Sequence, residues 1–264
     1  MGDKELERNE NMILDSFKLN GKVAVVTGAN TGLGQGMCVA LAQAGAKVVG
    51  VARRSCEDTK NLISEFGGEF KEVIADLSTM DAISTIMDGA LNSFGRVDIL
   101  VNNAGVIKRN DAIDFTEEEW DSVVCVNEKM VFFLSQAFAK QFIKQGEGGK
   151  IININSMLSY QGGIRVPSYA ASKSASMGLT KAMCNEWAKY GINVNAIAPG
   201  YMETNNTAQL RSDASRSEAI IDRIPAGRWG TPDDMKGAVV FLASSASDYV
   251  NGFTLAVDGG WLAR

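Results

Sequence analysis

The chain has 264 residues, of which 45% are hydrophobic and 22% are charged. This length fits one large α/β domain, and no apolar run approaches the ~18 residues needed to cross a membrane. The 26 basic and 31 acidic residues give a net charge of -5, and no basic stripe marks a surface for nucleic acid. We therefore expect one globular domain whose partners include neither nucleic acid nor a membrane.

Histidine is missing from the sequence, which excludes catalytic sites built on an imidazole base and zinc sites of the H-E-x-x-H type. Acid and base chemistry must then come from Tyr, Lys, Asp, Glu or Cys. No two cysteines have the C-x-x-C spacing of a redox or zinc motif, so we expect buried thiols, a cytoplasmic location and no bound metal. The cysteines are Cys38, Cys56, Cys125 and Cys184.

The first eleven residues are polar and charged and lack the apolar segment of a secretory signal. We predict a polar N-terminal extension over residues 1–16 and a single domain over residues 17–264.

From Lys22 onward, short β-branched runs alternate with longer helical stretches, which is the pattern of β-α-β units around a parallel sheet. The apolar runs are nearly continuous, as expected for strands that helices cover on both faces. The predicted strands are 23–27, 47–52, 69–75, 97–101, 150–155, 193–198 and 253–257. The predicted helices are 34–44, 57–66, 81–94, 117–145, 168–190 and 232–244. Together they predict a doubly wound α/β fold with a seven-stranded parallel sheet flanked by helices.

Two helix starts carry clear sequence signals. Thr116 stands before three glutamates, and Thr231 stands before a proline and two aspartates, so both threonines are predicted N-caps. Residues 200–224 break the alternation, because they are polar and follow the sixth strand. We expect this segment to be a mobile lid over a ligand.

A glycine-rich segment joins the first predicted strand to the first predicted helix. Glycine suits such a turn because the backbone angles are unusual, and because a diphosphate reaches the N–H groups of a helix N-terminus only where no Cβ intervenes. A glycine-rich turn without a ligand is the alternative, and the strand-turn-helix context favours a dinucleotide. The candidate cofactor-binding residues here are Gly28, Asn30, Thr31, Gly32, Leu33 and Gly34.

The second predicted strand ends at Ala52, where dinucleotide-binding folds often place an acid on the adenosine ribose. Arg53 and Arg54 follow instead, and two guanidinium groups could clamp a 2′-phosphate. This local sequence permits NADP. Arginines that face solvent or stack on adenine are the alternative, so the choice between NAD and NADP stays open.

Further motifs follow in a fixed order: Asn102-Asn103-Ala104-Gly105 after the fourth strand, then Ser156, then Tyr169-x-x-x-Lys173. With the glycine-rich turn, this set resembles the short-chain dehydrogenase/reductase family over residues 17–264. The resemblance implies a single Rossmann-type domain and a catalytic tetrad of Asn127, Ser156, Tyr169 and Lys173. It also implies further cofactor contacts from Arg53, Asp76, Leu77, Asn103, Ala104, Gly105, Tyr169, Lys173, Pro199, Gly200, Met202 and Thr204.

The chemistry of the four tetrad positions can be argued from the residues themselves. Tyr169 and Lys173 lie on one face of a helix. A free phenol with a pKa near ~10 is a poor base at neutral pH, and an adjacent ammonium together with an oxidised nicotinamide favours the phenolate. Ser156 is placed to hydrogen-bond the substrate oxygen, while Asn127 could hold a water that links Lys173 to solvent.

The segments 156–169, 205–207, 223–230 and 257–264 resemble the branch of this family that acts on sugar acids. This resemblance implies hydride transfer between NAD, with NADP also possible, and a keto or hydroxyl group of a small sugar acid in uronate breakdown. It also implies a homotetramer.

A sugar acid needs an anchor for its carboxylate, which the guanidinium fork of an arginine supplies. Arg165 is the first candidate and Arg109 the second. The alternative is that Arg165 pairs with a nearby acid or lies at a subunit contact. Substrate hydroxyls are expected to meet Ser156, Tyr169, Gln161, Asn205 and Asn206.

Two other functions stay open at this point. One is a broad-specificity ketone reductase or a 3-oxoacyl-carrier reductase that uses NADPH. The other is a non-catalytic, dinucleotide-sensing scaffold on the same fold, which the fold alone permits.

Overall fold

The computed structural model describes residues 12–264, so the first eleven residues of the predicted extension lie outside the described part. Seven strands of that part form one parallel sheet in the order β3-β2-β1-β4-β5-β6-β7. The strands are β1 (Val23–Thr27), β2 (Lys47–Ala52), β3 (Phe70–Ile74), β4 (Ile99–Asn102), β5 (Gly149–Ile154), β6 (Ile192–Pro199) and β7 (Thr254–Val257). The predicted seven-stranded parallel sheet is confirmed.

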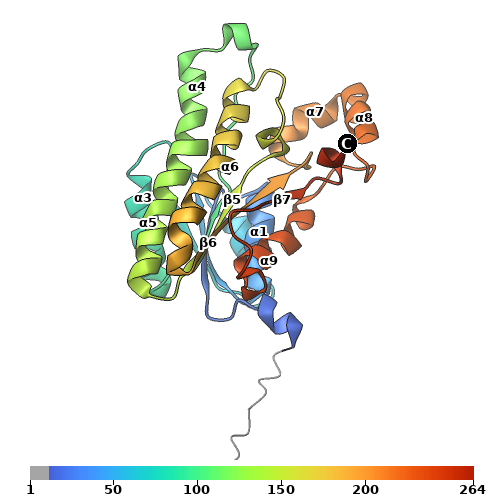
Figure 1. Cartoon of the computed structure of the whole chain (residues 1–264). Coiled ribbons are helices and arrows are strands. Elements are labelled where there is room, and N and C mark those ends of the chain that lie inside the picture. Colours follow the sequence, from blue (N-terminus) through green and yellow to red (C-terminus); the bar gives the residue numbers. More distant parts are fainter. Residues whose placement is uncertain (1–11) are drawn as a thin grey trace, which may run out of the picture.

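Helices cover both faces of the sheet (Figure 1). One layer contains α1 (Gly32–Gln43), α2 (Glu57–Ser64) and α9 (Lys236–Ala243). The other contains α3 (Ala82–Phe94), α4 (Glu117–Val124), α5 (Met130–Gln145) and α6 (Pro167–Trp187). Short 3-10 helices occupy η1 (Ile13–Phe17), η2 (Ala112–Asp114), η4 (Met157–Ser159), η5 (Ala188–Tyr190), η7 (Pro232–Met235), η8 (Ser245–Ser247) and η9 (Trp261–Ala263). The doubly wound arrangement is therefore confirmed.

The central strands bury side chains on both sides, which explains their nearly continuous apolar sequences. In β1, Val23 and Val25 pack into the cluster beneath α3, α5 and α6. Ala24 and Val26 pack into the cluster beneath α1 and α9. Because the strands are parallel, their carboxyl ends share one edge, and the winding reverses between the neighbours β1 and β4. Ligand sites of open α/β sheets form at such a reversal.

The segment 200–224, the predicted mobile lid, is largely helical. It contains η6 (Asn205–Thr207), α7 (Ala208–Ser212) and α8 (Ala214–Arg223). The Asp213 carboxylate caps α8 by accepting from the Arg216 N–H at 3.1 Å. Ile220 is buried against Trp229 and Trp261, so the segment packs on the chain end. The expected mobility of this segment stays a prediction.

The predicted helix 117–145 is interrupted by a turn of π-helix, η3 (Cys125–Lys129), between α4 and α5. Its predicted start is confirmed, because Thr116 Oγ1 accepts from the Glu119 N–H at 3.2 Å and the Glu119 carboxylate accepts from the Thr116 N–H at 3.0 Å. Thr231 likewise heads a capping box with Asp234.

All four cysteines are free thiols. Cys38 and Cys56 are buried as expected, whereas Cys125 and Cys184 are only half-buried. At the start of the described chain, the ring of Phe17 lies 6.3 Å from that of Phe241. Across residues 12–264, every helix is too short or too polar to traverse a lipid bilayer.

Candidate active site

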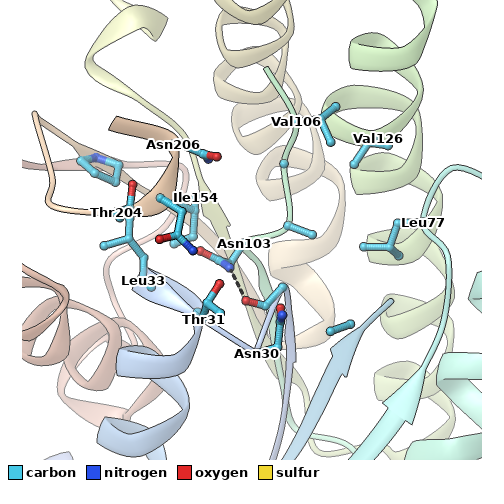
Figure 2. A pocket seen from close by; sticks show the side chains of 18 of the residues that line it. Asn30, Thr31, Leu33, Leu77, Asn103, Val106, Val126, Ile154, Thr204 and Asn206 are labelled. Atoms are coloured by element: carbon cyan, nitrogen blue, oxygen red, sulfur yellow. Dashed lines mark hydrogen bonds between the residues drawn. The ribbon is translucent and has the colours of Figure 1, made fainter. Parts of the chain in front are cut away.

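A cleft of about 550 Å³ lies along the carboxyl edge of the sheet. Its walls come from the segments that follow β1, β2, β3, β4, β5 and β6, together with α6 and η6 (Figure 2). The predicted cofactor residues that line it are Gly28, Asn30, Thr31, Gly32, Leu33, Gly34, Arg53, Asp76, Leu77, Asn103, Ala104, Gly105, Tyr169, Lys173, Pro199, Gly200, Met202 and Thr204. Ser156, Asn205 and Asn206 line it as well.

Four predicted site residues do not line the cleft: Arg109, Asn127, Gln161 and Arg165. Sequence reasoning missed seven lining residues: Ala75, Ser78, Val106, Val126, Ile154, Asn155 and Thr207. Asn155 was the one with a usable signal, since it directly precedes Ser156. The two valines look like ordinary core residues in the sequence.

The glycine-rich turn leaves backbone groups free at the start of α1. Gly28 and Gly32 have φ angles of +69° and +57°, in the left-handed region that glycine favours. A Cβ on Gly34 would lie 2.1 Å from the Gly28 carbonyl oxygen. Thr31, the N-cap residue, makes no side-chain hydrogen bond to the first turn. The N–H groups of that turn are therefore available to an anion, which fits the diphosphate of a dinucleotide.

Asn103 supports this turn from the neighbouring strand β4. Its side-chain Nδ2 donates to the Thr27 carbonyl oxygen at 2.8 Å. It also donates to the Gly28 carbonyl oxygen at 3.3 Å (Figure 2). In return, Thr27 Oγ1 accepts from the backbone N–H groups of Asn103 and Ala104, both at 3.0 Å. These bonds tie β1 to the segment after β4 across the reversal of winding. Asn103 thus positions the glycine-rich turn.

At the far end of the cleft, Arg53 and Arg54 are exposed and follow β2 without an intervening acid. The acid in this part of the cleft lining is Asp76, which follows the next strand, β3. The pKa of its carboxyl is lowered, first because the Ser78 backbone N–H donates to it at 3.0 Å, and in smaller part by the charge of Arg53. This end of the cleft therefore presents two guanidinium groups.

Tyr169 and Lys173 lie on the same face of α6, and Lys173 Nζ is 5.7 Å from the centroid of the Tyr169 ring. Lys173 is 6% exposed, and its Nζ donates to the Ile154 carbonyl oxygen at 2.5 Å. Burial lowers the pKa of Lys173 to about 8. Its ammonium is therefore held in place by the end of β5 and titrates close to neutral pH.

Burial raises the pKa of Tyr169, and this effect outweighs the opposing effects of a hydrogen bond with Ser156 and of the positive charge on Arg109. The sequence led us to expect that Lys173 and an oxidised nicotinamide together lower this pKa, and their combined effect stays a prediction. In the chain alone the lowering groups are Ser156 and Arg109, and the phenol is protonated at neutral pH. The physical reason is that the ring lies in a desolvated wall, where the phenolate is disfavoured.

Asn127 lies on the π-helical turn and is fully buried. Its Oδ1 accepts from the Val106 N–H at 2.9 Å, and its Nδ2 donates to the Val106 carbonyl at 2.9 Å and to Ser172 Oγ at 3.3 Å. We expected this side chain to hold a water. In the structure its amide binds the segment after β4 and joins that segment to α6, and the expected water stays a prediction.

The comparisons with known proteins agree on the family. The family model described as enoyl-(acyl carrier protein) reductase matches residues 28–262. The chain is 63% identical over 253 residues to 2-dehydro-3-deoxy-D-gluconate 5-dehydrogenase of Escherichia coli K12, covering 96% of this chain and 100% of that protein. It is 35% identical to the crystal structure of a short-chain type dehydrogenase/reductase from Mycobacterium marinum, with a TM-score of 0.91 and coverage of 96% and 100%. The chain belongs to the short-chain dehydrogenase/reductase family.

A third similar protein shows what a member of this family binds. The crystal structure of a gluconate 5-dehydrogenase from Burkholderia cenocepacia contains NADP and tartrate. It is 40% identical to this chain, has a TM-score of 0.90 and is covered completely by 96% of this chain. The present short-chain dehydrogenase/reductase is thus an enzyme of the oxidoreductase class, and the reading as a non-catalytic scaffold is not supported.

The two candidate arginines of this dehydrogenase/reductase occupy different places. Arg165 is exposed, and its Nε lies 2.9 Å from the carboxylate of Asp111. That is the pairing with a nearby acid which the sequence left as an alternative. Arg109 donates to the Asn206 carbonyl oxygen at 3.1 Å, and its charge acts on Tyr169. Of the two, Arg109 is the one connected both to the cleft wall and to the phenol.

Ser156 has one hydrogen bond that fixes its orientation. Its Oγ accepts from the Leu158 N–H at 3.1 Å, which makes it the N-cap of η4. The hydroxyl hydrogen is left to donate, and the side chain lies beside Tyr169 in the cleft. Gln161, by contrast, accepts from Arg223 at 3.5 Å outside the cleft lining.

Proposed function

We propose that this enzyme transfers hydride between a nicotinamide cofactor and a keto or hydroxyl group of a small sugar acid. The proposed pair is 2-dehydro-3-deoxy-D-gluconate and 2,5-diketo-3-deoxygluconate, in uronate breakdown. The observation that carries the proposal is the guanidinium of Arg109 beside the cleft wall that holds Tyr169. Full-length similarity to the Escherichia coli 2-dehydro-3-deoxy-D-gluconate 5-dehydrogenase supports the same substrate class.

Each catalytic residue is assigned one task. The bound cofactor supplies or accepts the hydride. Ser156 donates its hydroxyl hydrogen to the reacting oxygen, since its Oγ is already an acceptor for Leu158. Tyr169, protonated at neutral pH, gives its proton to that oxygen in reduction and becomes a phenolate. In oxidation the reaction runs backwards, and the phenolate form accepts the proton from the substrate hydroxyl. Lys173 holds a positive charge beside the ring, anchored by the Ile154 carbonyl.

For the cofactor, we propose that both NAD(H) and NADP(H) are accepted at the glycine-rich turn. Arg53 and Arg54 support the use of NADP(H), because they are exposed at the cleft end and no acid follows β2. The 2′-phosphate of NADP(H) is doubly charged and suits a pair of guanidinium groups. Replacing both arginines by Ala is expected to raise KM for NADPH by roughly tenfold or more and to leave KM for NADH nearly unchanged.

The substrate class is tested by a screen that follows the absorbance of the reduced nicotinamide. Rates are measured with NADH and NADPH on 2,5-diketo-3-deoxygluconate, an uncharged ketone and a 3-oxoacyl carrier. The proposal expects the sugar acid to have the highest kcat/KM. A higher value for the acyl carrier would establish the carrier-linked reductase in its place.

The Arg109→Ala and Arg165→Ala variants form a matched pair for the carboxylate anchor. Arg109→Ala should raise KM for the sugar acid by about tenfold or more while the uncharged ketone is little affected, because only the acid loses a charged partner. Arg165→Ala should change neither value by much. If Arg165→Ala has the selective effect instead, the anchor is Arg165.

Tyr169→Phe tests the catalytic assignment separately. This variant should lose turnover with every substrate and keep its dinucleotide affinity, because the ring stays and only the proton donor is removed. Full activity in Tyr169→Phe would refute the proposed mechanism. We also propose that the enzyme is a cytoplasmic homotetramer. Light scattering in solution measures the mass of the assembly, and a monomeric or dimeric mass would contradict the tetramer.

A further inference from the structure

Asn155 is a buried amide at the cleft that no described part of the chain satisfies. It directly follows β5, is 2% exposed and lines the cleft. Its backbone N–H donates to the Ile197 carbonyl at 2.7 Å. Its side-chain Nδ2 and Oδ1 are both buried and have no hydrogen-bond partner within residues 12–264. A buried amide with neither group paired is costly, so its partner must come from outside the chain.

The neighbouring amide on the same face of the strand shows the contrast. Asn153, two residues earlier, accepts from Asn102 Nδ2 at 2.9 Å and donates to Thr180 Oγ1 at 2.9 Å. Asn102 also donates to Ser135 Oγ at 3.0 Å. The fold thus provides partners for the amide at position 153. At position 155 the strand has reached the cleft, and the partner must be a molecule held there.

Lys173 lines the same cleft as this unpaired amide and bonds the residue that precedes it. The Ile154 carbonyl that accepts from Lys173 Nζ belongs to the peptide group that leads into Asn155. An ammonium carries three N–H donors, and Ile154 takes one of them. Lys173 and Tyr169 are the titratable groups that face this point from α6, and Arg109 acts on Tyr169 from the segment after β4. From η3 the facing group is Asn127, whose neutral amide is bonded to Val106.

We propose that Asn155 is a positioning residue that holds a buried water against the ammonium of Lys173. Water fits because it both donates and accepts, as the two unpaired groups of the amide require, and the cleft wall there is polar. The water accepts from Lys173 Nζ and pairs with the Asn155 side chain. This keeps the ammonium oriented beside Tyr169, so the inference rests on the catalytic roles proposed above.

Kinetics of the Asn155→Leu variant test this role, since Leu keeps the volume of the side chain and removes its polar groups. The expected result is a kcat lowered by roughly 3- to 10-fold with an unchanged KM for the sugar acid and an unchanged Kd for NADPH. The alkaline limb of the kcat profile should move to lower pH by about half a unit, because the ammonium loses a polar partner. Asn155→Ser, which retains a polar group, should restore part of both changes.

Asn153→Ala is the matched control, because its amide lies on the same face and has its partners within the fold. It should lower Tm and leave the alkaline limb in place. The proposal is overturned if Asn155→Leu leaves that limb unmoved. It is also overturned if Asn155→Leu raises the Kd for NADPH at unchanged kcat, since the amide then binds the cofactor.

A crystal structure of the wild-type enzyme provides a readout that needs no substrate. We expect a water within hydrogen-bond distance of both the Asn155 side chain and Lys173 Nζ. A direct bond from this amide to another side chain would overturn the inference. If the wild type proves inactive on every substrate, the proposed function fails while the water is still tested, so the two failures are distinguishable.

Discussion

Gly34 shows how one missing Cβ shapes the cofactor end of the cleft. An alanine methyl there would lie 2.1 Å from the Gly28 carbonyl oxygen and 2.5 Å from Asn103 Nδ2. Both neighbours are fixed by the bonds between β1 and the segment after β4, so the turn itself must move.

We therefore predict that Gly34→Ala destabilises the fold by about 1–3 kcal/mol and weakens NADPH binding at least tenfold. Fluorescence titration and thermal unfolding measure the two effects. Gly178→Ala is the control, because a Cβ at that exposed position of α6 meets nothing within 4 Å. Equal NADPH affinity in the two variants would contradict the prediction.

The buried ammonium of Lys173 makes the reaction rate depend on pH. Burial lowers its pKa from 10.5 to about 8, so its positive charge is lost as the pH rises through that value. We expect the kcat of the reductive reaction to fall above a pH of about 8, because Tyr169 then lacks its charged neighbour. A profile that stays flat for a further unit or more would show that the charge on Lys173 is not needed.

The lowered pKa of Lys173 also makes the free energy of unfolding depend on pH. Between a pH of about 8 and 10.5 the unfolded chain binds more protons at this lysine than the folded chain does. The contribution of Lys173 to the free energy of unfolding therefore rises with pH over that window. It is smallest below a pH of about 8, where the folded protein holds a buried ammonium.

At the scale of the element, the π-helical turn η3 connects three parts of the site. It places the Asn127 amide against Val106, and Asn127 also reaches Ser172 on α6. The turn breaks what the sequence predicts as one helix over 117–145. The sequence of residues 125–129 does not predict the π-helical turn. The turn places the Asn127 amide against Val106, which lies in a loop 21 residues away in the chain.

We predict that Asn127→Ala lowers the free energy of unfolding by about 1–3 kcal/mol, because both backbone groups of Val106 lose their partner. KM for the sugar acid should also rise, since Arg109 lies on the loop that is released. Chemical denaturation and steady-state kinetics measure these effects. Asn127→Asp retains the acceptor for the Val106 N–H and should lose less stability, and a larger loss than in Asn127→Ala would contradict this account.

At the scale of the whole molecule, the sequence predicts the sheet well and the site in part. Alternating β-branched and helical stretches yield all seven strands, because the central strands are buried on both faces and each apolar run is local in the chain. The strand ends also bring Ser156 and the glycine-rich turn to one cleft. What local patterns miss is contact between distant segments, such as Arg109 with Asn206, 97 residues apart.

Residues near position 261 complete a third hydrophobic cluster, which joins segments far apart in the sequence. Trp261 is buried with Met157, Ile220, Ile224 and Trp229. Arg223 lies 4.0 Å from the centroid of the Trp261 ring, and the C-terminus lies beside α8 (Figure 1).

We predict that Trp261→Ala costs about 3–5 kcal/mol of stability and raises KM for the sugar acid, because η4, which Ser156 caps, packs on this cluster. The Kd for NADPH should change little, since the glycine-rich turn lies in a separate core cluster. Thermal unfolding and titration measure both effects. A large loss of NADPH affinity at full sugar-acid affinity would be the contrary result.

This cluster has a consequence for incomplete chains. The last strand of the sheet ends at Val257, whereas the Trp261 indole that completes the wall behind Ser156 comes later in the chain. A chain cut between Val257 and Trp261 thus keeps all seven strands but lacks the indole that packs behind Ser156. Such a chain exposes tryptophan and isoleucine side chains that Trp261 otherwise covers. Chaperones and proteases recognise exposed apolar side chains of this kind in incomplete chains.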